Sequence, residues 1–439
     1  MNAGRRGGHR SISACQEAGT GDNTMRSQKQ IAVFGSFLTD VHCVEFKMAE
    51  DLGCLLARNG FKVICGGHGG IANSLVAGVT RGGGEVLGVS LAKSRYPERS
   101  AKTNPLITER FAINSPAERL EFFANSDAFI FFTGGIGTLT EFSFVWHSLQ
   151  LSADFDRPIV LVSKSWKRIL ASIRNEQMVK HKYYRMLHLC DRIKDAVAVV
   201  ADDYALKYDE PGGSLRKRSV LFHLDGTVVE SREEEFSRLC EDAGYFFPLP
   251  DVVAAFRETT PFETKPAHFA AILQRLGVAA GTAAAIAGHL CCQITKIPEL
   301  YPDALEALHH LKESGFSTGV VSWRHPSQVK EILSAHNLSA LFDFAGTPDN
   351  AAGRSGASVA GGALEVSGFS REGTVYIADG FQGDCPPACT GGIDTILLDR
   401  YLTHIQGEDG FKLRSLKELK SLVKYDAAAG EGKADPAGY

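Results

Sequence analysis

Short apolar runs that end in glycine or serine alternate with amphipathic stretches over the first half of the chain. The run over 31–36, IAVFGS, predicts a strand, and the apolar residues of 45–59 recur at helical spacing, with Gly60 as a stop signal. Further predicted strands lie at 61–67, 85–91, 127–132 and 158–163, and further predicted helices lie at 70–83 and 117–126. Such alternation with short connections is typical of a parallel sheet that is covered on both faces. The pattern therefore predicts an α/β domain over residues 29–205.

A second α/β pattern follows a polar stretch. Residues 206–218 are charged and contain glycine and proline, which predicts a linker. Predicted strands at 219–227, 317–323 and 374–379 accompany a largely helical insert over about 230–298. We therefore predict two tandem Rossmann-like parallel-sheet α/β domains, the second over 219–425 and carrying a helical cap.

Both ends of the chain are polar. Residues 1–28 are rich in glycine, serine and arginine, which predicts a disordered extension, with an organelle-targeting segment as the alternative. Residues 426–439 hold too few apolar side chains to pack, and they predict a disordered tail.

Composition narrows the class of ligand. A chain of 439 residues exceeds what one ordinary core uses, which agrees with two domains. The formal net charge of −4 provides no basic field for nucleic acid, and no apolar run approaches the roughly 20 residues that span a bilayer. The ten cysteines lie mostly within apolar runs and lack the paired spacing of a zinc site. We expect a cytoplasmic protein with reduced thiols that binds a small molecule, with no membrane and no nucleic-acid partner.

A glycine loop is the strongest candidate site in the sequence. Residues 133–141, TGGIGTLTE, run from a predicted buried strand into a helix, whose first N–H groups and macrodipole favour a phosphate. Close approach of the backbone and one hydroxyl donor are expected from Gly134, Gly135, Gly137 and Thr138. Glu141 lies one turn into the helix, where phosphate would repel it, so we expect its carboxylate to face ribose hydroxyls or an attacking water.

A second loop strengthens this prediction. Residues 65–78, CGGHGGIANSLVAG, also join a strand to a helix, and parallel strands place such loops at one edge of the sheet. The additional residues expected in this cleft are Gly35, Ser36, Gly66, Gly67, Gly69 and Gly70. A tight turn explains either loop alone equally well, whereas two adjacent loops favour a ligand cleft.

These loops resemble the Lonely Guy (LOG), or lysine-decarboxylase-like, family, whose pattern reads PGGxGTxxE. The resemblance covers the glycine loop and residues 66–89, with Thr133 where the family has proline. It implies a phosphoribohydrolase that releases free base and ribose 5-phosphate from a nucleoside 5′-monophosphate without a cofactor, and it implies a homodimer. Because the sugar becomes oxocarbenium-like as the bond breaks, Glu141 is the candidate that stabilises positive charge and aligns water.

Arg119 is the candidate for the arginine that completes the site in this family, although it stands one residue later than the family pattern places it. An exposed, salt-bridging arginine explains this residue equally well. Trp146 and His147 could stack on a base or titrate beside it, but a core tryptophan and a surface histidine are favoured. The replaced proline and the shifted arginine leave open a non-enzymatic protein that binds or carries a nucleotide or cofactor.

The second domain resembles the haloacid dehalogenase (HAD) hydrolases. Residues 221–231, LFHLDGTVVES, match the motif DxDGT, with His223 at the nucleophile position and Asp225 at the acid/base position. Ser322 matches the phosphate-binding residue, and Asp379 and Asp384 match the magnesium-binding acids.

Two residues that the HAD motifs require, the aspartate nucleophile and the lysine of the third motif, are not found in this domain. The imidazole of His223 cannot copy an aspartate nucleophile and removes a magnesium ligand. The lysine of the third motif is also missing, since none occurs between Lys330 and Lys412, with Arg354 as a candidate replacement. We predict an inactive HAD-like domain that serves ligand sensing, dimerisation or stability, with Mg²⁺ at Asp225, Asp379 and Asp384 left open. A working phosphatase is the alternative.

Overall fold

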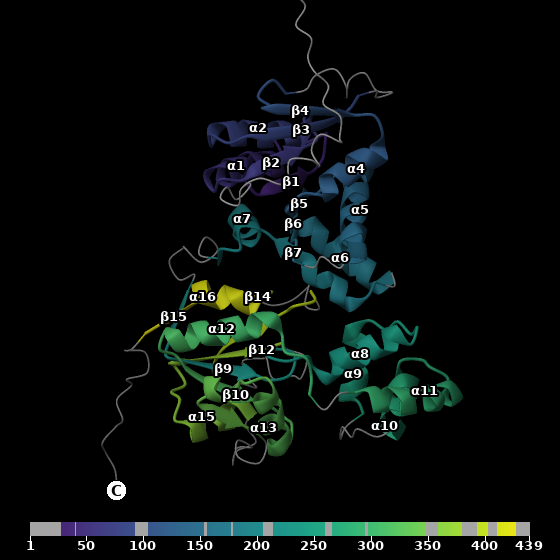
Figure 1. Cartoon of the computed structure of the whole chain (residues 1–439), viewed down its shortest axis with the longest axis vertical. Coiled ribbons are helices and arrows are strands. Elements are labelled where there is room, and N and C mark those ends of the chain that lie inside the picture. Colours follow the sequence, from purple (N-terminus) through teal and green to yellow (C-terminus); the bar gives the residue numbers. More distant parts are fainter. Residues whose placement is uncertain are drawn as a thin grey trace, which may run out of the picture.

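Two parallel sheets form the centres of two α/β domains, shown one above the other in Figure 1. The computed structural model describes residues 28–39, 41–92, 104–152, 156–176, 179–204, 214–259, 266–294, 297–347, 359–379, 393–402 and 411–426. The predicted fold class is confirmed. Apart from Gln28 and Asp426, the predicted extension and tail lie outside the described residues.

The first sheet has seven described strands in the order β4-β3-β2-β1-β5-β6-β7, and each pairs in parallel with its neighbours. They are β1 (Gln30–Phe34), β2 (Lys62–Cys65), β3 (Val86–Leu91), β4 (Glu109–Ile113), β5 (Ala128–Phe132), β6 (Ile159–Val162) and β7 (Leu187–Cys190). The sequence pattern missed both edge strands, because β4 is largely exposed and β7 is only partly buried, with a histidine between its apolar residues. The chain leaves β1 in one direction and returns to its other side at β5, which makes β1 and β5 the switch point of the sheet.

Helices cover both faces of this sheet, as the alternation predicts. One face packs against α1 (Val44–Arg58), α2 (Gly70–Arg81) and α7 (Ile193–Ala201), and the other against α4 (Pro116–Ala124), α5 (Ile136–Ser152) and α6 (Lys164–Glu176). A short 3-10 helix, η2 (His181–Met186), precedes β7. Ile31 and Val33 of β1 enter the first core, whereas Ala32 and Phe34 enter the second, because successive strand residues point to opposite faces.

Gly78 permits the close approach of α2 to α1. A Cβ at Gly78 would lie 1.8 Å from the carbonyl oxygen of Glu50 on α1. We expect Gly78→Ala to lower the free energy of unfolding by about 1–3 kcal/mol, since backbone must move to admit the methyl group. Urea unfolding measures this effect. Gly288→Ala is the matched control, since a Cβ at this helical glycine would meet no atom within 4 Å, and equal effects of the two substitutions would contradict the prediction.

The second sheet has six described strands in the order β11-β10-β9-β12-β13-β14. They are β9 (Ser219–His223), β10 (Ser317–Val321), β11 (Phe344–Gly346), β12 (Thr374–Ala378), β13 (Asp394–Leu398) and β14 (Phe411–Leu413). The larger core lies under α12 (Pro302–Glu313), α13 (Pro326–Ala335), η4 (Ser339–Leu341), η5 (Leu416–Glu418) and α16 (Leu419–Leu422), and α15 (Val359–Ser367) covers the opposite face. Here β9 and β12 form the switch point.

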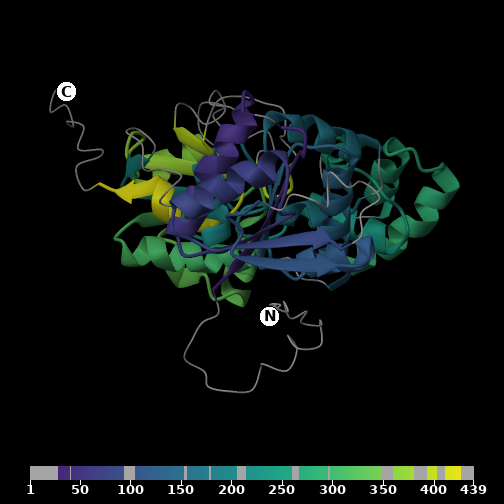
Figure 2. The same ribbon diagram turned by 90° about the horizontal axis from the view of Figure 1, so that it is seen from above.

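Four helices form a separate cap beside the second sheet. They are α8 (Arg232–Asp242), α9 (Leu249–Arg257), α10 (Pro266–Arg275) and α11 (Ala280–Gln293), and they share a core around Phe236 and Phe269. Figures 1 and 2 show the cap on the side of the molecule opposite to the C-terminal strand. Neither these nor the other described helices combine the length and apolar character needed to cross a bilayer.

Two arginines join the domains through backbone carbonyl groups. Arg414, after β14, donates from Nη2 to Tyr184 O at 3.0 Å and Leu187 O at 2.7 Å, and from Nη1 to Asp399 O. In the opposite direction, Arg174 of α6 donates to the carbonyl oxygens of Tyr401 and Leu402. Leu402 itself is buried in the core of the first domain. The β7 edge of the first sheet is therefore held against the second domain.

One structured element lies within the predicted linker. Residues 215–217 form β8 (Leu215–Lys217), which pairs in parallel with β15 (Val423–Tyr425) near the C-terminus. Nothing in the local sequence indicates this pair, because the partner strand is more than two hundred residues away and β8 is only three residues long, two of them charged.

Candidate functional site

Three loops of the first domain meet at the carboxyl ends of β1, β2 and β5. Gly35 and Ser36 follow β1, Gly66 and Gly67 follow β2, and Gly134 follows β5. This edge is the switch point of the sheet, where the crevice of an open α/β fold lies. The expectation that the loops lie side by side agrees with this topology.

The start of α5 depends on glycine. A Cβ at Gly134 would lie 2.2 Å from Thr138 Oγ1 and 3.0 Å from Ser36 N, so no larger residue fits between these two loops. A Cβ at Gly135 or Gly137 would meet nothing within 4 Å. The first turn of α5 is therefore accessible on its glycine side, with the positive end of the helix dipole directed outward.

The second loop comes equally close to the first strand. Gly67, Gly69 and Gly70 all have positive φ, and a Cβ at Gly70 would lie 2.1 Å from Ser36 O. Ile71 N donates to the same oxygen at 3.0 Å, which fastens the start of α2 to the loop after β1. Glycine is required here by both backbone conformation and space.

Arg119 and Glu141, the two predicted catalytic residues, form an ion pair. Nη1 of Arg119 lies 2.9 Å from Glu141 Oε1, and the two side chains are 20% and 14% exposed. Arg119 is fixed by a bond from Nε to Val89 O at 3.1 Å and by the ring of Phe123, whose centroid lies 4.7 Å from Cζ. A Cβ at Gly66 would lie 3.1 Å from Nη2 of Arg119, so the second glycine loop leaves room for the guanidinium. The arginine is thus neither an isolated nor a solvent-directed side chain.

Burial dominates the electrostatics of Glu141. Loss of solvent raises the pKa of its carboxyl group, and the charge and hydrogen bond of Arg119 lower it by a smaller amount, so the net pKa is raised. This carboxyl group is set to exchange a proton nearer to neutral pH than an exposed glutamate does.

The two aromatic side chains after the motif have separate surroundings. Trp146 is buried and donates from Nε1 to Tyr183 O at 3.0 Å, while His147 is exposed. The favoured core tryptophan and surface histidine both agree with these positions.

In the second domain, His223, Asp225 and Ser322 lie together at the carboxyl ends of β9 and β10. His223 is buried, with Nδ1 2.8 Å from Asp225 O, and its Nε2 has no hydrogen-bond partner among the described residues. Ser322 Oγ donates to Asp225 Oδ2 at 3.1 Å. Arg324, which the sequence analysis did not single out, donates to Asp225 Oδ1 from Nε at 2.7 Å and from Nη2 at 2.5 Å. The sequence signal that could have identified Arg324 is its position two residues after Ser322, the residue matched to the phosphate-binding motif.

The described residues do not fit the magnesium ion that the HAD motifs imply. Both carboxylate oxygens of Asp225 accept hydrogen bonds, and a guanidinium carries positive charge against one of them. Asp379 is buried against the loop of Gly226, where a Cβ would lie 1.8 Å from Asp379 Oδ2. No set of three His, Cys, Asp or Glu side chains in the described part of the chain is placed to hold a metal. Asp384 and Arg354 lie outside the described residues.

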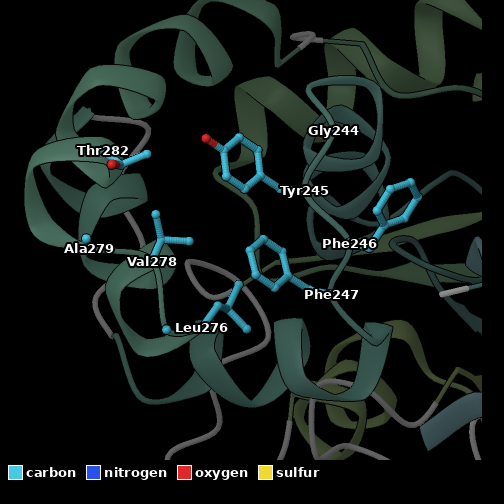
Figure 3. A pocket seen from close by; sticks show the side chains of 9 residues that line it. Gly244, Tyr245, Phe246, Phe247, Leu276, Val278, Ala279 and Thr282 are labelled. Atoms are coloured by element: carbon cyan, nitrogen blue, oxygen red, sulfur yellow. The ribbon is translucent and has the colours of Figure 1, made fainter. Parts of the chain in front are cut away.

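A shallow hollow on the cap is lined by mainly apolar side chains. Figure 3 shows Tyr245 and Phe247 facing Leu276 and Val278 across it, with Thr282 at its edge. It lacks a charged side chain that could bind phosphate. This hollow is therefore a poor candidate for the nucleotide site.

The comparisons with known proteins match each domain to a different family. Residues 73–200 match the family model described as "Possible lysine decarboxylase", and residues 220–398 match that of "Haloacid dehalogenase-like hydrolase". No curated protein sequence matches this chain significantly.

Solved structures similar to each domain are distant in sequence. The molybdenum cofactor carrier protein from Chlamydomonas reinhardtii is 18% identical over 40% of this chain and 97% of its own length, with a TM-score of 0.31. The molybdenum cofactor binding protein from Rippkaea orientalis is 17% identical over 41% of this chain and 98% of its own length, with a TM-score of 0.33. A HAD phosphatase from Thermococcus onnurineus is 16% identical over 46% of this chain and 96% of its own length, with a TM-score of 0.29. The chain is therefore similar to the lysine-decarboxylase-like (LOG) family over residues 73–200 and to the haloacid dehalogenase-like hydrolases over residues 220–398.

Proposed function

We propose that the first domain hydrolyses the N-glycosidic bond of a nucleoside 5′-monophosphate. The single observation that carries the proposal is the position of Glu141, a mostly buried carboxylate one turn beyond the open, glycine-lined start of α5. A phosphate at that helix start places the attached ribose toward the carboxylate. Arg119, 2.9 Å from Glu141, adds a positive charge at the same edge of the sheet.

The reaction follows from these two groups. The bond between C1′ and the base nitrogen lengthens, and the sugar gains positive charge that the Glu141 carboxylate stabilises. A water oxygen bonds to C1′ and gives up a proton to Glu141, while the base leaves with the bonding electron pair and takes up a proton from solvent. Glu141 then releases its proton to solvent and is ready for the next cycle. The products are the free base and ribose 5-phosphate. Arg119 holds Glu141 in place and keeps part of its population ionised.

Product analysis tests this function. The full chain is incubated with a panel of purine and pyrimidine nucleoside 5′-monophosphates, and mass spectrometry follows free base and ribose 5-phosphate. Release of both products in equal amounts supports the proposal. Recovery of every nucleotide unchanged would reject it.

A carrier of a nucleotide or related cofactor is the second candidate. It is favoured by the ion pair itself, because the positive charge of Arg119 offsets part of the negative charge that the ionised Glu141 would present to the sugar. A carrier is stabilised against heat by a ligand that is recovered chemically intact, whereas a hydrolase releases base from it. Thermal shift followed by mass spectrometry of the same sample therefore separates the two functions.

The pH dependence of hydrolysis is expected to report on Glu141. The ionised carboxylate is the active form, so kcat/KM rises as pH increases through its pKa, and burial places this rise above 4.5, the ordinary value. Arg119→Met removes the interactions that lower this pKa, so the rise moves to higher pH. Arg110→Met, at an exposed position on β4, is the control. Identical pH profiles for wild type and Arg119→Met would show that Glu141 is not the group that titrates.

We further propose that the second domain is not a phosphatase. A histidine stands at the nucleophile position, and the neighbouring Asp225 is engaged by Arg324 rather than free to move a proton. Phosphate release from phosphate monoesters that His223→Ala abolishes would reject this part of the proposal.

A further inference from the structure

The carboxylate of Asp225 is enclosed by hydrogen-bond donors of its own domain. Asp225 follows β9 and is 4% exposed, and Arg324 follows β10 and is 8% exposed. Two N–H groups of Arg324 meet Oδ1, at 2.7 Å from Nε and 2.5 Å from Nη2, and the hydroxyl of Ser322 meets Oδ2 at 3.1 Å. These three donors occupy three of the about four lone-pair directions of the two oxygens, and two of the donors belong to a cation.

Arg324 also interacts with carboxylates of the cap. Glu233 and Glu235 lie in the first turn of α8, the first helix of the cap. Burial alone lowers the pKa of Arg324, but the charges of Asp225, Glu233 and Glu235 outweigh it, and the pKa is raised. The guanidinium thus pairs directly with one core carboxylate and lies in the field of two acidic side chains of the cap, as a cation does where acids from several elements converge.

The remaining charges around Asp225 do not favour a second cation. Arg232, also in the first turn of α8, is mostly buried, and burial together with the charge of Arg324 lowers its pKa. A magnesium ion at Asp225 would therefore meet positive charge from Arg324 and Arg232, and it would find an imidazole in place of one carboxylate. Magnesium binds through oxygen ligands and does not replace them readily by nitrogen donors.

We infer that the guanidinium of Arg324 takes the place of a divalent cation beside Asp225 in the second domain. The domain then holds the site around Asp225 together without metal. Arginine suits this task because its charge is permanent and its planar fork presents several N–H groups at fixed angles.

Divalent-ion binding to the full chain tests the inference. Mn²⁺ binding is followed by electron paramagnetic resonance, and Mg²⁺ binding by thermal unfolding with and without millimolar Mg²⁺. The wild-type chain is expected to show neither Mn²⁺ uptake nor a shift of its melting temperature. Arg324→Ala frees the carboxylate of Asp225, so its melting temperature is expected to rise on addition of Mg²⁺, and this rise should be absent from the double variant Arg324→Ala/Asp225→Asn.

Two results would overturn the inference. The first is Mn²⁺ binding by the wild-type chain that Asp225→Asn or Asp379→Asn abolishes, because the site would then hold metal despite Arg324. The second is a folded Arg324→Ala variant whose melting temperature does not change on addition of Mg²⁺, because Arg324 would then not be the group that excludes the ion. Arg324→Ala leaves a buried carboxylate without its partner, so this variant can fail to fold. In that case the Mn²⁺ measurement on the wild-type chain tests the inference by itself.

Discussion

Glu141→Gln is expected to slow base release from a nucleoside 5′-monophosphate by about 10²–10⁴-fold, the usual contribution of a well-placed acid/base or charge-stabilising group. Glutamine keeps the length and hydrogen-bonding capacity of glutamate, so Arg119 retains a partner near its present place. What is lost is the negative charge beside the sugar and the ability to accept a proton from water. Steady-state kinetics with the best nucleotide of the panel measure this loss.

Ligand binding separates this chemical effect from a structural one. The start of α5 is unchanged in Glu141→Gln, so the dissociation constant of ribose 5-phosphate is expected to stay within a few-fold of the wild-type value, measured by calorimetry. Glu118→Gln is the matched control, because Glu118 is exposed and adjacent to Arg119 in sequence. A Glu141→Gln variant with wild-type kcat would reject the assigned role and leave the carrier as the better proposal.

Arg414→Met is expected to reduce the free energy of unfolding by about 3 kcal/mol or more. The substitution keeps an apolar stem but removes donors to three carbonyl groups, and hydrogen bonds from charged donors each contribute about 1.5–3 kcal/mol. Two of these carbonyl groups, those of Tyr184 and Leu187, belong to the first domain. The substitution therefore removes hydrogen bonds that connect the two domains. Urea unfolding followed by circular dichroism and tryptophan fluorescence measures it.

The control for Arg414 lies at the same junction but near solvent. Lys417 is 3.3 Å from Asp202 with both side chains at least 40% exposed, so Lys417→Met is expected to cost about 1 kcal/mol or less. Trp146 and Trp166 are buried in the first domain and Trp323 belongs to the second, so a separation of the two unfolding events is visible in Arg414→Met. Equal destabilisation by both substitutions would show that the carbonyl contacts of Arg414 do not hold the domains together.

Local signals were sufficient for most of the framework. Strand and helix periods depend on residues a few positions apart, so the alternation over 29–205 predicted a parallel sheet with helices on both faces. The same signals failed where an element depends on a distant partner. Strand β8 lies in the predicted linker and exists through its pairing with β15, and the edge strand β4 is largely exposed.

Residue types and their local order predict the kind of site in each domain. Gly134 and Gly70 indicate that two backbone segments approach closely at strand ends, and His223 indicates that the nucleophile is lost. Both features can be read from single residues and their sequence neighbours. Which charges meet depends on how the elements pack in three dimensions. Arg119 reaches Glu141 because β3, α4 and α5 converge, and Arg324 reaches Asp225 because β9 and β10 are neighbours. Charge pairing depends on distances between elements far apart in sequence, and packing of the sheets sets those distances.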